Sequence, residues 1–100
     1  MSGTVGLLDV VVAGCIGVDT NVYLPGAEID FDHEANFTVN LDYVGQAGGY
    51  SSRAFARLGV RTGFVGTVGD DALGDLVRST LERDGIRTLF FADPRGTHRS

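Results

Sequence analysis

Apolar residues recur along the chain in short runs that predict strands. The runs at 7–13 (LLDVVVA), 61–68 (RTGFVGTV) and 86–92 (IRTLFFA) are largely apolar. The first two predict strands buried on both faces, as in parallel sheets, and the third predicts a further apolar strand. Segment 37–44 (FTVNLDYV) instead alternates apolar and polar residues, which predicts a strand with one face in solvent. Its apolar side is formed by Phe37, Val39, Leu41 and Tyr43.

Two segments carry the apolar spacing of helices. The clearer one follows Asp71, which suits a helix N-cap, and ends at Gly85, which suits a helix stop. Its buried face recurs at i, i+3, i+4, i+7 and i+8 and is formed by Leu73, Leu76, Val77, Thr80 and Leu81. A shorter helix is predicted at 51–58, with Ser51 or Ser52 as its N-cap.

The order of these elements predicts an α/β fold. Strand, helix, strand, helix, strand is the signature of right-handed crossovers and of a parallel sheet flanked by helices. A strand with one wet face does not fit the middle of such a sheet. We therefore expect residues 22–44 to leave the main sheet and to form part of a small antiparallel β lid. Residues 97–100 are expected to begin a second lid strand.

Composition excludes several classes of function. The net charge is −5, and all eight basic residues are arginines that form no cluster, which argues against a nucleic-acid surface. Without a lysine there is no Walker A loop. No apolar stretch is long enough to span a membrane, and residues 1–6 lack the basic start of a secretory signal. A cytoplasmic protein without membrane partners is therefore expected.

Three local features predict no chemistry of their own. The single cysteine, Cys15, is predicted to be a small buried hydrophobe after a strand. Segment 28–34 alternates carboxylates but lacks the glycine and glutamate of an EF-hand, so a solvated turn and no metal site are predicted. Gly14 and Gly17 follow a strand, but the spacing of a dinucleotide fingerprint is absent, which disfavours a nucleotide-binding oxidoreductase domain.

Segment 56–85 carries an ordered set of motifs. A-R-L-G leads into a strand and ends at Gly59, and ten residues later Gly69, Asp71 and Gly74 form G-x-D-x-x-G at the start of the clearer helix. This order and spacing resemble the N-terminal signature region of the ribokinase/PfkB carbohydrate kinase family. The resemblance implies a ribokinase-like fold, of which this chain is the N-terminal part of a single domain.

An aspartate follows the first predicted strand at the family's spacing. The family's first strand ends in G-x-x-x-x-D, which Gly14 and Asp19 match. The resemblance implies that Asp19 binds hydroxyls of an acceptor, since ligands of open α/β sheets lie past the carboxyl ends of strands and carboxylates pair adjacent hydroxyls. Without the family, an aspartate in this context is more often a turn residue with local backbone bonds.

The glycine motif ahead of the first helix matches the family in part. Family members usually read G-G-x-G-x-N, and here Gly45 and Gly48 match while Gln46 and Tyr50 replace the second glycine and the asparagine. The resemblance implies that these four residues bind the acceptor together with Asp19. The alternative is that Gln46 is a solvated loop residue and Tyr50 a half-buried ring at a helix start.

The resemblance implies an ATP-dependent phosphotransferase of the carbohydrate or nucleoside kinase type. This chain would supply the acceptor site and the lid, while the catalytic aspartate, in a G-A-G-D stretch, and the ATP and Mg²⁺ sites would lie beyond residue 100. The isolated chain is then expected to be inactive. A homodimer through the apolar face of the lid is also expected. The alternative is a non-catalytic sugar- or nucleoside-binding module that keeps the kinase fold, which the two departures from the glycine motif favour.

Overall fold

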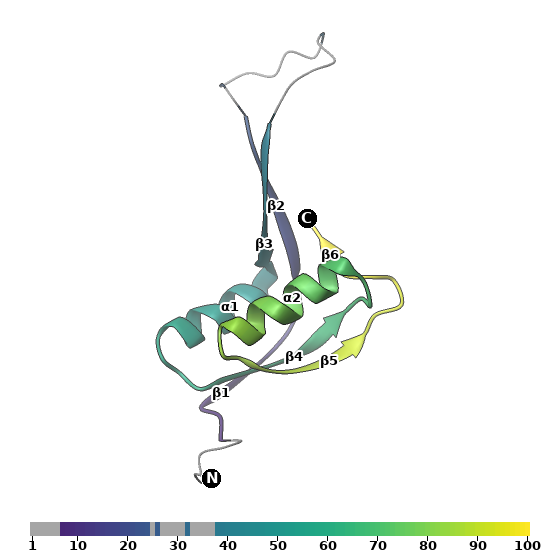
Figure 1. Cartoon of the computed structure of the whole chain (residues 1–100). Helices are drawn as coiled ribbons and strands as arrows, with labels where there is room; N and C mark the ends of the chain where they lie inside the picture. The colour runs from purple at the N-terminus through teal and green to yellow at the C-terminus, as the bar shows by residue number, and fades with distance from the viewer. Residues whose placement is uncertain (1–6, 25, 27–31, 33–37) are drawn as a thin grey trace.

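The computed structural model describes residues 7–24, 26, 32 and 38–100. Two helices and six strands follow one another along the chain (Figure 1). They are β1 (Val10–Ala13), β2 (Gly17–Tyr23), β3 (Val39–Gly45), α1 (Gln46–Arg57), β4 (Thr62–Val68), α2 (Ala72–Arg83), β5 (Arg87–Ala92) and β6 (His98–Arg99). No helix among the described residues has both the length and the apolar character needed to cross a membrane.

The main sheet is parallel and has helices on one side. Its strand order is β1-β4-β5, and α1 and α2 both lie on the same face of it, which confirms the predicted α/β class (Figure 1). Between sheet and helices lies a core formed by Ile16, Val18, Val44, Phe64, Val68, Val77, Leu81 and Ile86. The other face is uncovered in the described residues, with Val11, Leu89 and Phe91 more than half exposed. The prediction that segment 7–13 is buried on both faces is therefore wrong for its described strand, because helices cover only one face.

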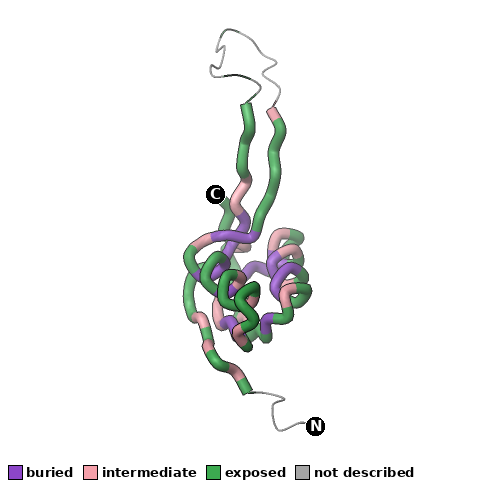
Figure 2. Tube along the Cα trace, turned by 90° about the vertical axis from the view of Figure 1, so that its left-hand side faces the viewer, coloured by how far each residue is buried: buried purple, intermediate pink, exposed green. Residues whose placement is uncertain are grey.

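A second sheet leaves the main body. Its order is β3-β2-β6, with β2 antiparallel to β3 and parallel to β6, so the small sheet is mixed rather than wholly antiparallel. It begins at Gly17, five residues before the predicted start of the lid at residue 22. The ribbon of β2 and β3 projects away from the helices, and most of its length is exposed (Figure 2). The radius of gyration of the whole chain is 16.9 Å, against about 13 Å for a compact chain of this size, and the projecting ribbon contributes to that difference.

Polar contacts hold β6 against the base of the ribbon. Arg99 Nη2 lies 3.3 Å from Asp42 Oδ1, and Thr20 Oγ1 donates to the same carboxylate oxygen over 2.6 Å. The backbone of Ser100 adds two hydrogen bonds to β2. Two of the sequence predictions concern residues outside the described part of the chain. They are the apolar-face position of Phe37 and the solvated turn at 28–34, of which the structure describes Asp32 alone.

The two helices differ in how well their starts match the sequence pattern. Helix α2 begins after Asp71, whose side chain accepts a hydrogen bond from the Gly74 amide, as predicted for an N-cap. Helix α1 instead begins at Gln46, five residues before the predicted start, and has Gly45 at its N-cap. Ser52 is not the cap, because it is buried in the helix and donates to the Gly48 carbonyl over 2.8 Å.

Close packing explains why glycines open α1. The Gly48 amide donates to the Cys15 carbonyl over 2.8 Å, and a Cβ at Gly48 would lie 2.6 Å from that oxygen and 2.8 Å from Phe64 Cε1. The first turn of α1 is therefore pressed against the chain that leaves β1. Cys15 contributes its backbone to this contact while its side chain is exposed, so the prediction of a buried cysteine is wrong.

Candidate functional site

Four polar side chains meet where α1, β2 and the end of the chain come together. The Tyr50 hydroxyl donates a hydrogen bond to Asp19 Oδ2, and Gln46 Nε2 lies 3.4 Å from Asp19 Oδ1. The same Gln46 nitrogen donates to Ser100 Oγ over 3.0 Å. Asp19 is thus brought together with Gln46 and Tyr50, which lie 27 and 31 residues further along the chain, and Ser100 is a member that the sequence pattern did not indicate.

The two matched glycines of the motif make room for this cluster. A Cβ at Gly45 would overlap the Asp19 carboxylate. Asp19 pairs with Tyr43, and Gly45 lies two residues further along β3, so both positions are on the same face of the small sheet. Gly48 allows α1 to approach the chain after β1, as described above. Both glycines therefore act through close backbone approach, which is the usual reason for glycine beside a site.

Gln46 adopts a backbone conformation that favours glycine. Its φ of 68° is the one positive value outside glycine among the described residues. A left-handed conformation costs a side-chain-bearing residue about 1–2 kcal/mol, and such residues cluster at functional sites. The conformation directs the Gln46 amide toward Asp19 and Ser100, so the second glycine of the family motif is replaced by a residue that supplies a donor.

The carboxylate keeps accepting capacity after these contacts. An ionised carboxylate offers about four lone-pair positions, of which the hydrogen bonds from Tyr50 and Gln46 use two. The hydrogen bond to Asp19 raises the pKa of Tyr50 above its ordinary value. Desolvation of the Tyr50 hydroxyl and the negative charge of Asp19 raise this pKa further. Tyr50 therefore stays a donor across the neutral range, and the remaining lone pairs of Asp19 suit the hydroxyls of a bound ligand.

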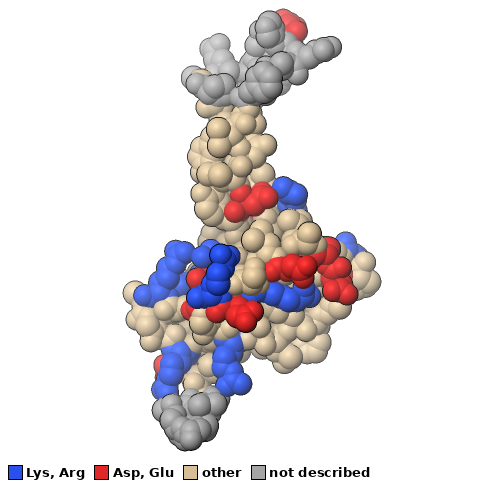
Figure 3. All heavy atoms as spheres, in the orientation of Figure 1, with Lys and Arg blue, Asp and Glu red and all other residues tan. Residues whose placement is uncertain are grey.

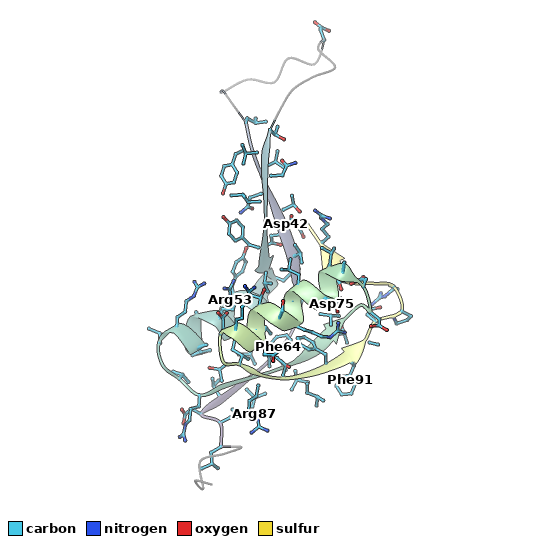
Figure 4. The ribbon with its side chains drawn as sticks, in the orientation of Figure 1. Asp42, Arg53, Phe64, Asp75, Arg87 and Phe91 are labelled. Atoms are coloured by element: carbon cyan, nitrogen blue, oxygen red, sulfur yellow. The ribbon has the colours of Figure 1, made fainter. Side chains whose placement is uncertain are left out.

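A second polar contact fixes the connection that leads into β6. The Asp71 carboxylate accepts from Thr97 Oγ1 over 2.6 Å and from the Thr97 amide over 2.9 Å, in addition to capping α2 (Figure 4 shows the described side chains). Thr97 Oγ1 in turn accepts from the Gly69 amide over 2.9 Å. Capping alone was predicted for Asp71, and its link to the small sheet was missed because the partners are 26 residues apart.

Asp71→Asn is expected to weaken the fold most at neutral pH. Hydrogen bonds from Thr97 and Gly74 lower the pKa of Asp71, so its stabilisation is complete above about pH 4, the unfolded value. It is lost as the pH falls through the lower folded pKa. Thermal melts from about pH 6 to about pH 2 should show the gap between parent and Asp71→Asn closing with acid. Thr97→Val should show a smaller gap, and a gap independent of pH would contradict the assignment.

The described residues show no ready metal site. No group of three or more His, Cys, Asp or Glu side chains lies close enough together in that part of the chain to hold an ion. The cluster at Asp19 is instead one carboxylate with amide, phenol and hydroxyl partners, which suits a neutral polyhydroxylated ligand.

Known proteins match the chain along most of its length. A family model described as pfkB family carbohydrate kinase matches residues 20–99. Acarbose 7(IV)-phosphotransferase of Actinoplanes sp. is 35% identical over 92 residues, covering 92% of this chain and 31% of the relative. The chain therefore spans about a third of the length of that relative.

Solved structures match the fold. A microbiome-derived acarbose kinase superposes with a TM-score of 0.83 at 28% identity, over 93% of this chain and 31% of that protein. A fructokinase from Xylella fastidiosa with bound ATP superposes with a TM-score of 0.72 at 22% identity, over 93% of this chain and 29% of that protein. The second match, at this identity, supports the fold alone.

Proposed function

The chain belongs to the pfkB family of carbohydrate kinases, as its motifs suggested, and from this membership we propose that it forms the acceptor site and the lid of a sugar or nucleoside kinase. The observation that carries the proposal is the Asp19 carboxylate, held by Tyr50 and Gln46 just past the carboxyl end of β1. That place is where ligands of open α/β sheets bind.

The chemistry of this segment is positioning. Asp19 would accept hydrogen bonds from two acceptor hydroxyls, and the Gln46 amide and the glycine backbone would fix the ring beside them. The small sheet above the site would exclude water when an acceptor is bound. Phosphoryl transfer depends on such positioning and on electrostatic stabilisation more than on covalent chemistry.

ATP is the proposed phosphoryl donor, with Mg²⁺ on its phosphates. The support is membership of the pfkB family of carbohydrate kinases. We propose, from the family resemblance, that ATP and Mg²⁺ bind outside this segment. When bound, ATP supplies the γ-phosphoryl group, and the residues of this chain hold the hydroxyl that receives it.

The complete protein is expected to transfer phosphate from labelled ATP to a member of a panel of sugars and nucleosides. The 100-residue chain alone is expected to transfer none, because the family's catalytic G-A-G-D stretch is not in its sequence. Clear transfer by the isolated chain would contradict this division of roles. Transfer by neither protein, with acceptor binding intact, would instead favour a binding module.

That second candidate rests on two departures from the family motif. Tyr50 occupies the position of the usual asparagine, and its hydroxyl is bonded to Asp19 in place of a ligand. Gln46 replaces the second glycine and adds side-chain bulk beside the same carboxylate. A module that binds sugars or nucleosides without phosphorylating them would retain Asp19 and tolerate both changes.

We also propose that the complete protein forms a homodimer through the lid. The register of β2 and β3 puts Tyr23, Val39 and Leu41 on one face of the ribbon, and Val39 is 61% exposed. On the side seen in Figure 3, charged atoms of the described ribbon appear only near its base. An apolar ribbon of this kind is commonly covered by a second subunit.

Sedimentation velocity of the complete protein should show a dimer. Leu41→Asp should convert it to a monomer, because the charge would be buried in the interface. Asp75→Asn on the exposed side of α2 is the control and should leave the dimer intact. A monomer at all concentrations tested would contradict the proposal.

A further inference from the structure

A crevice continues from the Asp19 cluster along helix α1. It has a volume of about 530 Å³, within the range of small-molecule sites. Its lining comes from the small sheet on one side and from α1 on the other, chiefly Asn21, Tyr43, Tyr50, Arg53 and Arg57. Figure 4 places Arg53 at the junction of these two elements.

The crevice adjoins the Asp19 cluster at Tyr50. Strand pairing puts Tyr43 directly opposite Asp19, and Asn21 lies two residues further along β2, so all three share one face of the small sheet. Tyr50 belongs to both places, because its hydroxyl is bonded to Asp19 while its side chain lines the crevice. A ligand held at Asp19 would therefore reach the crevice past the Tyr50 side chain.

The lining suits a sugar ring. Tyr43 and Tyr50 are 44% and 58% exposed, and such rings offer an apolar body with a polar tip. Asn21 supplies both an amide donor and an acceptor, and Arg57 supplies guanidinium donors for hydroxyl oxygens. Apolar ring faces with a few polar groups between them match the alternation of C–H and O–H groups on a pyranose or furanose.

The charges argue against an anionic ligand. Arg53 is already paired with Asp84, and the neighbouring Asp19 carboxylate would repel a second negative charge. Arg57 is the crevice cation that has no ion-pair partner within the described ranges. One exposed guanidinium beside a carboxylate is a weak anion site but a sufficient donor for a hydroxyl.

We propose that this crevice is a second sugar subsite, so that the acceptor is an oligosaccharide rather than a monosaccharide. This inference rests on the proposed function: Asp19 holds the terminal sugar unit that is phosphorylated, and the next glycosyl unit lies between Tyr43, Tyr50 and Arg57. The crevice then determines acceptor length, while the Asp19 cluster determines which hydroxyl is presented.

The test compares matched short and long acceptors on the complete protein. Calorimetry and phosphate transfer are measured with glucose, maltose and maltotriose and with galactose and lactose. The preferred disaccharide should bind about tenfold more tightly than its monosaccharide, since one added stacking or hydrogen-bonding contact is worth about that factor. Tyr43→Ala and Arg57→Ala should each remove about tenfold from disaccharide affinity and leave monosaccharide affinity within about twofold.

Arg83→Ala is the matched control, because Arg83 ends α2 as Arg57 ends α1 but lies outside the crevice. It should change neither affinity. The subsite would be overturned if short and long acceptors bind with equal affinity. It would also be overturned if Tyr43→Ala and Arg57→Ala weaken the binding of both acceptors equally. In either case phosphate transfer would show that the kinase itself works. Preferential loss of gluconate or glucuronate binding in Arg57→Ala would overturn it in favour of an anion site. Failure of all these sugars to bind to protein that melts show to be folded would overturn this inference. Failure of the wider panel of sugars and nucleosides as well would overturn the proposed function.

Discussion

Asp19→Ala in the complete protein is expected to reduce acceptor affinity and catalytic efficiency by tens-fold to thousands-fold. The carboxylate is oriented by Tyr50 and Gln46, and its loss would leave acceptor hydroxyls unpaired in a partly dry site. Losing a charged hydrogen-bonding partner in such a setting costs about 2 to 5 kcal/mol. ATP affinity without acceptor should hardly change, because the proposed site is on the acceptor side. Acceptor calorimetry beside an ATP titration measures both effects.

Two further variants separate a binding role from a structural one. Asp19→Asn keeps the shape of the side chain and one accepting oxygen, so an intermediate loss of acceptor affinity is expected. Asp75→Asn removes an exposed carboxylate that lies 3.4 Å from Arg78 Nη1, away from the Asp19 cluster, and it should leave acceptor affinity unchanged. Unchanged acceptor binding in Asp19→Ala, with or without a lower melting temperature, would mean that Asp19, which lies in strand β2 and not in a turn, has a structural role only.

The sequence predicted best the elements that have a long apolar pattern, either at helical spacing or as a continuous buried strand. Helix α2 was predicted with its cap because five apolar-face residues recur at helical spacing behind Asp71. Strand β4 was predicted because it is the central strand of the main sheet and is mostly buried. The position of strand β1 was predicted correctly, but its burial was not. The apolar pattern of one strand does not show whether helices cover both of its faces.

The elements that were missed have no such pattern. Strand β2 (Gly17–Tyr23) is mostly exposed beyond its first residues, so neither face is marked by apolar residues in alternation. The first turn of α1 contains Gly48 and Gly49, which have poor helix propensity and predict a loop when considered alone. Their helical conformation follows from tertiary packing against the chain after β1, which is not a local property.

The candidate site was also predicted only in part. Asp19, Gln46 and Tyr50 were selected because they occupy positions of a family motif, and the structure brings them within hydrogen-bonding distance. The contact of Gln46 with Ser100 spans 54 residues, and the crevice forms only where β3 lies against α1. The spacing of residues along the sequence predicts neither feature, because both depend on how two sheets and a helix are placed in space.

Gly48→Ala is expected to lower the free energy of unfolding of the complete protein by about 1 to 3 kcal/mol, the usual cost of overpacking. The new methyl group would lie 2.6 Å from the Cys15 carbonyl oxygen and 2.8 Å from Phe64 Cε1. Neither neighbour can move easily, because one is backbone that accepts the Gly48 amide and the other is a ring in the core. Urea unfolding followed by circular dichroism measures the loss.

Gly49→Ala is the matched control, since it adds the same methyl group one position further along α1. Its nearest neighbours would be Ile16 Cγ1 at 3.3 Å and Val44 Cγ1 at 3.4 Å, which are side-chain atoms that can adjust. Alanine also gains about 1 kcal/mol of helix propensity over glycine, so stability should be unchanged or slightly higher. Only Gly48→Ala should also weaken acceptor binding, because displacing the first turn of α1 moves Gln46 and Tyr50 away from Asp19. Equal stability of the two variants would show that α1 does not approach the chain after β1 as closely as described.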